Sequence, residues 1–166
     1  FNMRIIPIPF FTDNFCYAVF RRGYPSLSLV DPAHWPTVKS FISSHSELKT
    51  LKLSEVLTTH KHNDHAGGNL EILKENKVKI YGGEFDDIPG VTDKVRDKDE
   101  FILPNGLKVK ILHTPCHTLG HVQFYVQNLA LDREYNEAKR ALFCGDTLFV
   151  GGCGRFFEGT ASDMLQ

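Results

Sequence analysis

The sequence lacks long apolar runs, a dense cysteine framework and clusters of like charge. Its longest apolar runs are far shorter than the roughly 20 residues of a membrane-spanning helix. Its four cysteines, Cys16, Cys116, Cys144 and Cys153, form no CxxC pair, and we expect reduced thiols in a protein of the cytoplasm or the mitochondrial matrix. Residues 1–11 lack the basic leader and cleavage site of a signal peptide.

Charge gives a second exclusion. The net charge is −1, and no run of Lys or Arg marks a protein that binds nucleic acid or a membrane surface. The most densely charged stretch, residues 93–100, mixes both signs and is expected to be a solvated loop. With 166 residues, 42% of them hydrophobic, the chain is long enough for one domain with its own core.

Apolar segments and turn residues predict strands first, followed by alternating elements. The expected strands are residues 3–9, 15–20, 26–30, 53–59, 78–81, 101–103, 107–112, 121–127 and 141–144. Pro36 suits the first position of a helix that we expect to reach Leu48, and residues 69–75 predict a second helix. Residues 129–139 are polar and predict a surface excursion, and residues 160–163 have the character of a capping box.

Four candidate metal ligands fall within six residues of the segment 58–68. His60, His62, Asp64 and His65 directly follow an apolar strand. Imidazole and carboxylate are the ligands that borderline divalent metals such as zinc prefer. On a helix His60 and His62 would point to different sides, so their spacing favours a strand end followed by a tight turn. A single His is more often a surface or core residue, but a cluster of four candidate ligands predicts a metal site with room for two ions.

Two later segments contain ligands that such a site still needs. One contains His113, His117 and His121 and follows a strand, so these residues lie near a strand's C-terminal end. The other places Asp146 directly after a strand, where the two oxygens of a carboxylate can bridge two cations. Taken by itself, Asp146 is equally compatible with a turn residue or a helix cap. Its place at the end of a three-part pattern favours a ligand.

The order His-x-His-x-Asp-His, a later His and a still later Asp resembles the metallo-β-lactamase superfamily. Within it, three segments closely resemble the glyoxalase II family, the hydroxyacylglutathione hydrolases. They are Thr-His-Lys-His-Asn-Asp-His-Ala-Gly-Gly-Asn, Thr-Pro-Cys-His-Thr-Leu-Gly-His and Gly-Asp-Thr-Leu-Phe-Val-Gly-Gly-Cys-Gly-Arg-Phe-Phe-Glu-Gly-Thr. The resemblance extends from Asp13 to Met164. It implies an α/β fold (α+β in some schemes), the metallo-β-lactamase-like αββα sandwich, with residues 1–166 as one catalytic domain truncated at its C-terminus.

The resemblance also implies a set of metal ligands. The first site would comprise His60, His62 and His117, and the second Asp64 and His65, with Asp146 bridging the two. Two divalent ions are expected, zinc first, with iron or manganese also compatible. Asp64 would orient a metal-bound hydroxide or accept its proton, and His113 and His121 would be packing or supporting residues. Cys116 lies next to His117, but we do not expect it to be a nucleophile.

Substrate recognition in the family involves the segment that corresponds to residues 154–157. Arg155 stands where a basic residue is usual, and a cation there suits an anionic peptide carboxylate. Phe156 follows it, and Phe157 stands where Tyr is common, so one hydrogen bond to glutathione is missing. The expected partner is a small glutathione thioester, with no nucleic acid and no membrane, and the protein is expected to be a monomer.

The family pattern continues beyond Gln166 with a further His in a Gly-His-Glu-Tyr-like segment and a helical region that helps to hold glutathione. This sequence contains neither, so we expect weaker binding of the second metal and little or no activity from this chain alone. The predicted reaction is hydrolysis of S-(2-hydroxyacyl)glutathione, with S-D-lactoylglutathione giving D-lactate and glutathione, the second step of methylglyoxal detoxification, by a metal-bound hydroxide. The alternatives are a single-iron persulfide dioxygenase of the same fold and a truncated, metal-binding isoform without activity.

Overall fold

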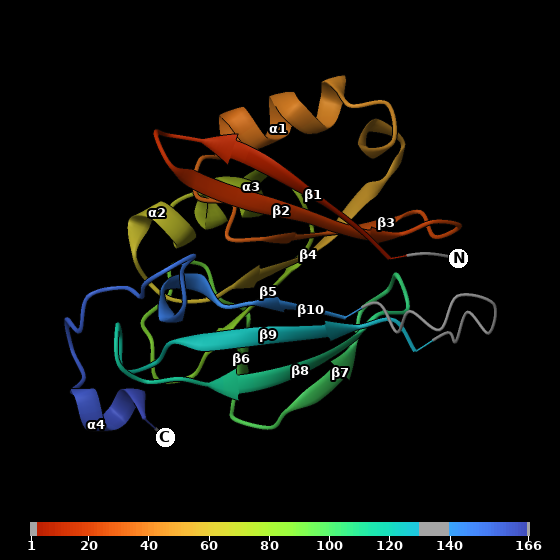
Figure 1. Ribbon diagram of the computed structural model, residues 1–166. Coiled ribbons are helices and arrows are strands. Elements are labelled where there is room, and N and C mark those ends of the chain that lie inside the picture. Colours follow the sequence, from red (N-terminus) through yellow and green to blue (C-terminus); the bar gives the residue numbers. More distant parts are fainter. Residues whose placement is uncertain (1–2, 130–139, 166) are drawn as a thin grey trace.

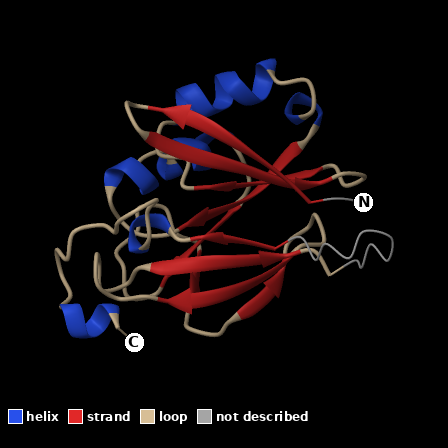
Figure 2. Cartoon of the chain, in the orientation of Figure 1, coloured by secondary structure: helices blue, strands red, loops and turns tan. Residues whose placement is uncertain are grey.

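The computed structural model describes residues 3–129 and 140–165, which form two facing β-sheets with helices on one side (Figure 1). The six-stranded sheet has the order β1-β2-β3-β4-β5-β6, and the four-stranded sheet has the order β10-β9-β8-β7. Figure 2 shows the two sheets as separate red layers, with the larger helices outside the upper layer. This is the mixed α/β layer arrangement that the sequence predicts.

The six-stranded sheet begins antiparallel and continues parallel. Its strands are β1 (Met3–Phe10), β2 (Asn14–Arg21), β3 (Ser26–Val30), β4 (Lys52–Thr58), β5 (Lys79–Gly83) and β6 (Asp93–Val95). The first three strands are joined by short turns, which suffice between antiparallel neighbours. The pairs β3–β4 and β4–β5 are parallel, and a parallel pair needs a crossover, which helices provide here.

Helices α1 (Trp35–Ser44) and α3 (Asn69–Glu75) provide these crossovers, and a short α2 (Asn63–Ala66) precedes α3. They pack on one face of the six-stranded sheet (Figure 1). The core between them and the sheet consists of apolar side chains, chief among them Ile8, Leu27, Leu29, Trp35, Val38, Leu48, Val56, Ile72 and Ile80. Burial of such side chains is the main favourable term that holds the helical layer on the sheet.

The four-stranded sheet is antiparallel throughout. Its strands are β7 (Glu100–Ile102), β8 (Lys108–His113), β9 (Val122–Gln127) and β10 (Arg140–Phe143). A second core fills the space between the sheets and includes Val19, Val30, Leu57, Leu107, Val109, Ile111, Phe124 and Val126. Alternating strand residues point into this core, as expected for two sheets packed face to face.

The predicted αββα sandwich therefore appears with one helical layer in the part of the chain that the structure describes. No helix of residues 3–129 and 140–165 covers the outer face of the four-stranded sheet (Figure 1). After the single turn η2 (Gly145–Thr147) the chain runs as a loop to the four-residue α4 (Ala161–Met164). Its capping box is present as predicted, because the side chains of Thr160 and Asp163 each accept from the other's backbone N–H.

Three predictions of secondary structure differ from the structure by more than one residue. The first helix ends at Ser44 rather than Leu48, because the Ser43 and Ser44 hydroxyls bond the carbonyls of Lys39 and Phe41 and compete with the helix. A separate 3₁₀ turn, η1 (Leu48–Thr50), follows. The fifth strand continues through Gly83, two residues beyond the prediction.

The third error concerns residues 93–100, which are not only a solvated loop. Asp93–Val95 form β6, an edge strand that pairs with β5, and β7 begins at Glu100. Charged side chains are common on edge strands, where they discourage further pairing, so charge density was a poor guide here. The excursion predicted for residues 129–139 lies, apart from Leu129, outside the described residues. No helix of the described residues is long and apolar enough to cross a membrane.

Candidate metal centre

The candidate ligands lie at one edge of the two sheets, where several strands end. His60 follows β4, Asp146 follows β10, and His117 lies in the loop between β8 and β9. The loops that carry them meet beside α2 and η2, at the left of Figure 1. Strand direction therefore brings together residues up to 86 positions apart, as expected for a site built on the loops of a layered fold.

The first group consists of three histidines whose ring nitrogens converge. The distance from His60 Nε2 to His62 Nδ1 is 3.1 Å, and that from His62 Nδ1 to His117 Nε2 is 2.9 Å. The ring planes of the three pairs lie 81° to 86° apart, so the rings surround a common point rather than stack. His60 and His117 are buried, and His62 is half-buried.

Neighbouring groups fix the tautomers of two of these rings. The Thr59 hydroxyl donates to Asp31 Oδ2 at 2.8 Å, so it accepts from His60 Nδ1 at 3.1 Å and leaves His60 Nε2 unprotonated. His117 Nδ1 donates to the Arg155 carbonyl at 2.8 Å, which leaves His117 Nε2 unprotonated. Two nitrogen lone pairs therefore face the same space. This donor set fits a divalent cation, since ligating histidines usually donate their other N–H to a fixed acceptor.

A second group lies directly beside the first. The ligand atoms of His60, His65 and Asp146 lie within 4.8 Å of one another. His65 Nε2 lies 3.1 Å from Asp146 Oδ1, and His117 Nε2 lies 3.2 Å from Asp146 Oδ2. The two oxygens of Asp146 thus face different groups, which is the arrangement that a bridging carboxylate needs.

Asp64 lies beside the second group, outside the tightest set of atoms. Its Oδ2 is 3.5 Å from His65 Nε2, and it accepts from Asn14 Nδ2 at 3.2 Å. Its side chain is 51% exposed, compared with 19% for Asp146. The structure therefore brings all six predicted ligands to one place, with Asp64 facing the solvent side.

The electrostatics differ between the rings. Burial and the neighbouring imidazoles hold the pKa of His60 far below its usual range. Burial also lowers the pKa of His65, but Asp31 and Asp146 outweigh this and raise it to about 10. Burial raises the pKa of Asp146, yet His65 and the other imidazoles bring it below its ordinary value. The carboxylates around His65 thus favour a positive charge on that ring, whereas His60 stays neutral.

Asp31 supports both groups, and sequence reasoning missed it. It is buried and accepts from the Thr59 backbone N–H and hydroxyl, both at 2.8 Å, and its Oδ2 lies 3.0 Å from His65 Nδ1. Its φ is +51°, a conformation that few residues other than glycine adopt. The available signal was its position directly after β3 and before Pro32, which we interpreted only as the end of a strand.

Asp86 is a second missed residue. It is 2% exposed and accepts from Lys61 N at 3.0 Å, Thr118 Oγ1 at 2.8 Å and Gly120 N at 3.1 Å. It therefore joins the loop after β4 to the loop after β8. A Cβ at Gly120 would lie 2.2 Å from Asp86 N, so only glycine fits there. No local sequence pattern distinguished Asp86 from an ordinary surface Asp.

His121 supports two of the ligands, Asp146 and His60, as expected. It is fully buried, its Nε2 accepts from Asp146 N at 3.2 Å, and its ring stacks on His60 with centroids 4.9 Å apart. Burial lowers its pKa to about 3, so it stays neutral. Gly145 makes the sharp turn before Asp146 at φ +48°, where a Cβ would lie 2.7 Å from His121 Nε2.

Cys116 shows none of the features of an activated nucleophile. Its thiol is buried and donates to the Thr160 carbonyl at 3.5 Å. Burial raises its pKa above the ordinary value, which disfavours the thiolate. The adjacent His117 directs its two nitrogens to the Arg155 carbonyl and to the first group. These three observations agree with the expectation that Cys116 is not catalytic.

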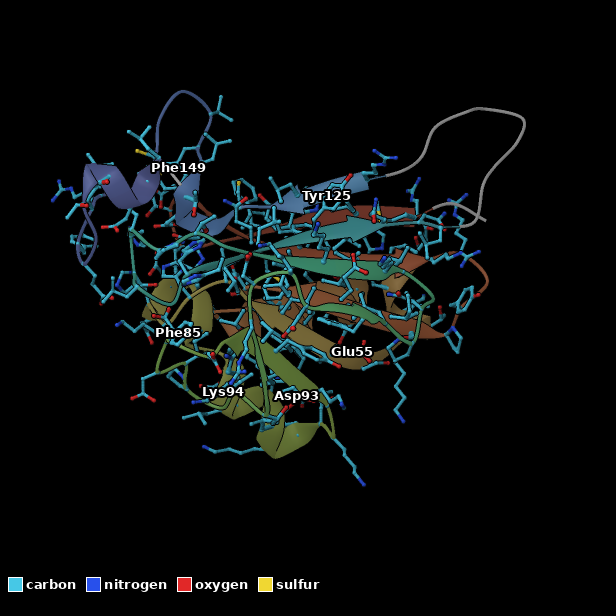
Figure 3. The ribbon with its side chains drawn as sticks, turned by 90° about the horizontal axis from the view of Figure 1, so that it is seen from below. Glu55, Phe85, Asp93, Lys94, Tyr125 and Phe149 are labelled. Atoms are coloured by element: carbon cyan, nitrogen blue, oxygen red, sulfur yellow. The ribbon has the colours of Figure 1, made fainter. Side chains whose placement is uncertain are left out.

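The predicted recognition residues lie at the mouth of the site. Phe157 is 61% exposed, and its ring centroid lies 5.7 Å from that of His62 and 5.1 Å from that of His117. Arg155 and Phe156 are exposed beside it. Phe149 and Phe85 also lie at this end of the molecule, whereas Glu55 and Tyr125 lie further along the strands (Figure 3). The Phe157 ring thus borders the converging ligands.

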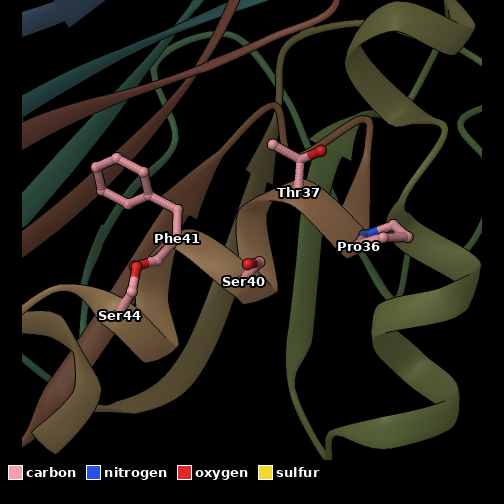
Figure 4. Close-up of a pocket in the computed structure, with 5 residues that line it drawn as sticks. All are labelled: Pro36, Thr37, Ser40, Phe41 and Ser44. Atoms are coloured by element: carbon pink, nitrogen blue, oxygen red, sulfur yellow. The ribbon is translucent and has the colours of Figure 1, made fainter.

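A groove elsewhere on the molecule carries no comparable chemistry. It lies on the outer side of α1 and is lined by Pro36, Thr37, Ser40, Phe41 and Ser44 (Figure 4). These side chains include no titratable group and no preferred metal ligand. The metal centre is therefore the candidate functional site.

Comparison with known proteins agrees with this geometry. The family described as the metallo-beta-lactamase superfamily matches residues 26–164. A protein of Arabidopsis thaliana named hydroxyacylglutathione hydrolase cytoplasmic is 40% identical over 99% of this chain and 60% of its own length. A hydroxyacylglutathione hydrolase of Idiomarina loihiensis is 34% identical over 99% of this chain and 58% of its own length. The chain thus spans about 60% of the curated relatives that it matches.

Solved structures share the fold at lower sequence identity. The crystal structure of ETHE1 from Myxococcus xanthus has a TM-score of 0.74 and 24% identity, and covers 99% of this chain and 66% of that one. The crystal structure of TTHA1623 in a di-iron-bound form has a TM-score of 0.66 and 23% identity, and covers 96% and 82%. At this identity they support the fold only. The family match, the layered sheets and the converging histidines together show that this chain belongs to the metallo-β-lactamase superfamily.

Proposed function

We propose that this chain carries the metal-binding part of a hydroxyacylglutathione hydrolase, an enzyme that hydrolyses S-(2-hydroxyacyl)glutathione such as S-D-lactoylglutathione. The observation that carries the proposal is the position of residues 155–157 at the mouth of a cluster of converging nitrogen and carboxylate ligands. Relatives with this name are 34% and 40% identical over nearly the whole chain. The Arabidopsis relative is named as cytoplasmic, and we propose the same compartment for this chain. We also propose that the protein is a monomer.

Two divalent ions are proposed, with zinc first. His60, His62 and His117 would hold one ion, Asp64 and His65 the other, and Asp146 would contact both. Imidazole-rich sites suit zinc, and the same ligands accept iron and manganese. Bound divalent ions polarise a carbonyl oxygen and make water acidic enough to supply hydroxide near neutral pH.

The chain's own residues would bind, orient and shield the substrate. The Arg155 guanidinium, which is exposed beside the site, would bind a carboxylate of the glutathione moiety. The Phe157 ring packs against the imidazoles of His62 and His117 and would shield them from water on that side. Asp64, oriented by Asn14 Nδ2, would take the proton of the attacking water. In the net reaction water adds to the acyl carbon, the C–S bond breaks, and the thiol leaves with a proton.

Metal analysis and an activity assay on one sample test this proposal. Close to two metals per chain together with hydrolysis of S-D-lactoylglutathione would support it. Oxygen consumption with glutathione persulfide and one iron per chain would favour the dioxygenase alternative. Bound metal without either reaction, in a chain that spans about 60% of its relatives, would assign only metal binding to this part of the protein.

A further inference from the structure

The segment of residues 154–159, here called the bracing segment, is attached to the loops that carry the metal ligands. Gly154 N donates to the Asp146 carbonyl at 2.8 Å. The Arg155 carbonyl accepts from His117 Nδ1 at 2.8 Å, which fixes the tautomer of that ligand. The recognition residues and the ligand support therefore belong to the same stretch of backbone.

The Glu158 side chain attaches the bracing segment to both histidine loops. Its Oε1 lies 2.6 Å from Lys61 Nζ, and Lys61 stands between the ligands His60 and His62. Its Oε2 accepts from Leu119 N at 2.8 Å, two residues beyond the third ligand of the first group. One carboxylate thus spans two loops that are separated by more than 50 residues in sequence.

The adjacent residue brings this attachment into contact with the ligands themselves. Phe157 packs against His62 and His117, with ring centroids 5.7 and 5.1 Å apart. A shift of Glu158 would therefore move the Phe157 ring and the Arg155 carbonyl together. Because metal affinity depends on how ligand nitrogens are held, such a shift would act on metal binding.

We propose that Glu158 is a positioning residue of the first metal site. Through Lys61 and Leu119 it holds the bracing segment against both histidine loops, and so aligns His62 and His117. The Lys61 and Glu158 side chains are 32% and 28% exposed, and an ion pair of this exposure contributes little to global stability. Its removal is therefore expected to change metal affinity more than the free energy of unfolding. The inference rests on the proposed first site but does not depend on the substrate.

Three variants separate the two contacts of Glu158. Glu158→Gln keeps an acceptor for Leu119 N but loses the charge. Lys61→Met removes the ion pair with Glu158 together with the longer, 3.9 Å pair between Lys61 Nζ and Asp86 Oδ1. Glu158→Ala removes both contacts. Glu100→Gln is the matched control, because Glu100 forms a 2.6 Å ion pair with Lys108 on strands β7 and β8.

The experiment is a Co²⁺ titration of the metal-free chain against a chromophoric chelator, with the visible absorption of bound Co²⁺ recorded. Outer partners of metal ligands typically contribute 10- to 100-fold to affinity, so we expect Glu158→Ala to weaken Co²⁺ binding at least about tenfold and to alter the spectrum. Smaller losses are expected for Glu158→Gln and for Lys61→Met, and the double variant Lys61→Met/Glu158→Gln should lose no more affinity than Lys61→Met alone. Glu100→Gln should match the wild type.

Wild-type affinity and spectrum in Glu158→Ala, with folding verified by circular dichroism, would overturn the inference. If that variant does not fold, unchanged affinity in both Glu158→Gln and Lys61→Met would overturn it equally. Failure of the wild type to bind Co²⁺ would overturn the metal site and the inference together. An inactive chain that binds Co²⁺ and responds to Glu158 would leave the inference standing and assign only metal binding to this part of the protein.

Discussion

Two clusters of buried polar groups in this chain differ in kind. At the strand ends, His60, His62 and His117 direct nitrogen atoms at one another at 2.9 to 3.1 Å, although two of these nitrogens carry no proton. Within the strands, Glu55 Oε2 accepts from the Ser28 hydroxyl at 3.1 Å. Figure 3 shows Glu55 away from the end of the molecule at which the metal centre lies.

The polar groups of the second cluster, around Glu55, hydrogen-bond to one another. Ser28 Oγ also accepts from Asn105 Nδ2 at 3.2 Å, and Asn105 Oδ1 accepts from Leu107 N. Burial raises the pKa of Glu55 to about 7, so near neutral pH much of it is protonated and needs no cation. Buried polarity by itself therefore does not indicate a site. What distinguishes the metal centre is that two unprotonated ring nitrogens and the Asp146 carboxylate converge on one space, a geometry that suits a cation.

The largest expected effect is on the cluster with converging acceptors. His62→Ala removes the nitrogen that lies near both other rings of the first group, and we expect it to remove most of the bound metal. Metal content after purification and dialysis measures this. His45→Ala, which changes a histidine after α1, is the control. Unchanged metal content in His62→Ala would contradict the claim that the histidine cluster, unlike the cluster around Glu55, binds metal.

The next largest expected effect is a pH dependence of the free energy of unfolding, which arises from Glu55 in the second cluster. The folded pKa of Glu55 is raised to about 7, so the carboxyl binds its proton more tightly in the folded than in the unfolded state. Its ionisation therefore costs nothing below about pH 4 and costs up to about 3 kcal/mol above pH 7. Glu55→Gln should leave unfolding in urea unchanged near pH 4.5 and raise the free energy of unfolding at pH 8.5. An equal effect at both pH values would contradict the assigned pKa.

Asp31→Asn tests whether metal affinity depends on a carboxylate that holds a ligand without being a ligand itself. It removes the charge that holds His65 while keeping an acceptor for Thr59 N. We expect a 10- to 100-fold loss of metal affinity, mainly for the second ion. Asp93→Asn, at an exposed ion pair with Lys79, is the control. Equal affinity in both variants would show that the carboxylate outside the ligands is dispensable.

The smallest expected effect is at the mouth of the site. Arg155→Ala should raise KM for a glutathione thioester about tenfold, with a smaller change in kcat, because it removes a charge-assisted contact that forms on binding. Steady-state kinetics in the chain or in a longer form measure this, with Arg96→Ala as the control at a surface ion pair. An equal KM change for a thioester without glutathione would argue against Arg155 as a recognition residue.

Errors in the predicted elements have local causes. The helix predicted from Pro36 to about Leu48 ends at Ser44, because the serine hydroxyls near its end compete for backbone carbonyls. Strand β6 was missed because its three residues become a strand only through pairing with β5, ten residues earlier. Such edge pairing leaves no periodic pattern in three residues.

The sequence by itself determined the ligand types and their nearest spacing. His60, His62, Asp64 and His65 follow one strand, so covalent connection is enough to bring them together, and their chemistry predicts a divalent metal. The tertiary structure decided what holds them. Asp31, Asp86 and Glu158 each act across 25 or more residues, and their roles depend on which strand ends meet at one edge. Hydrogen bonds act over about 3 Å of space, whereas a motif records only distance along the chain.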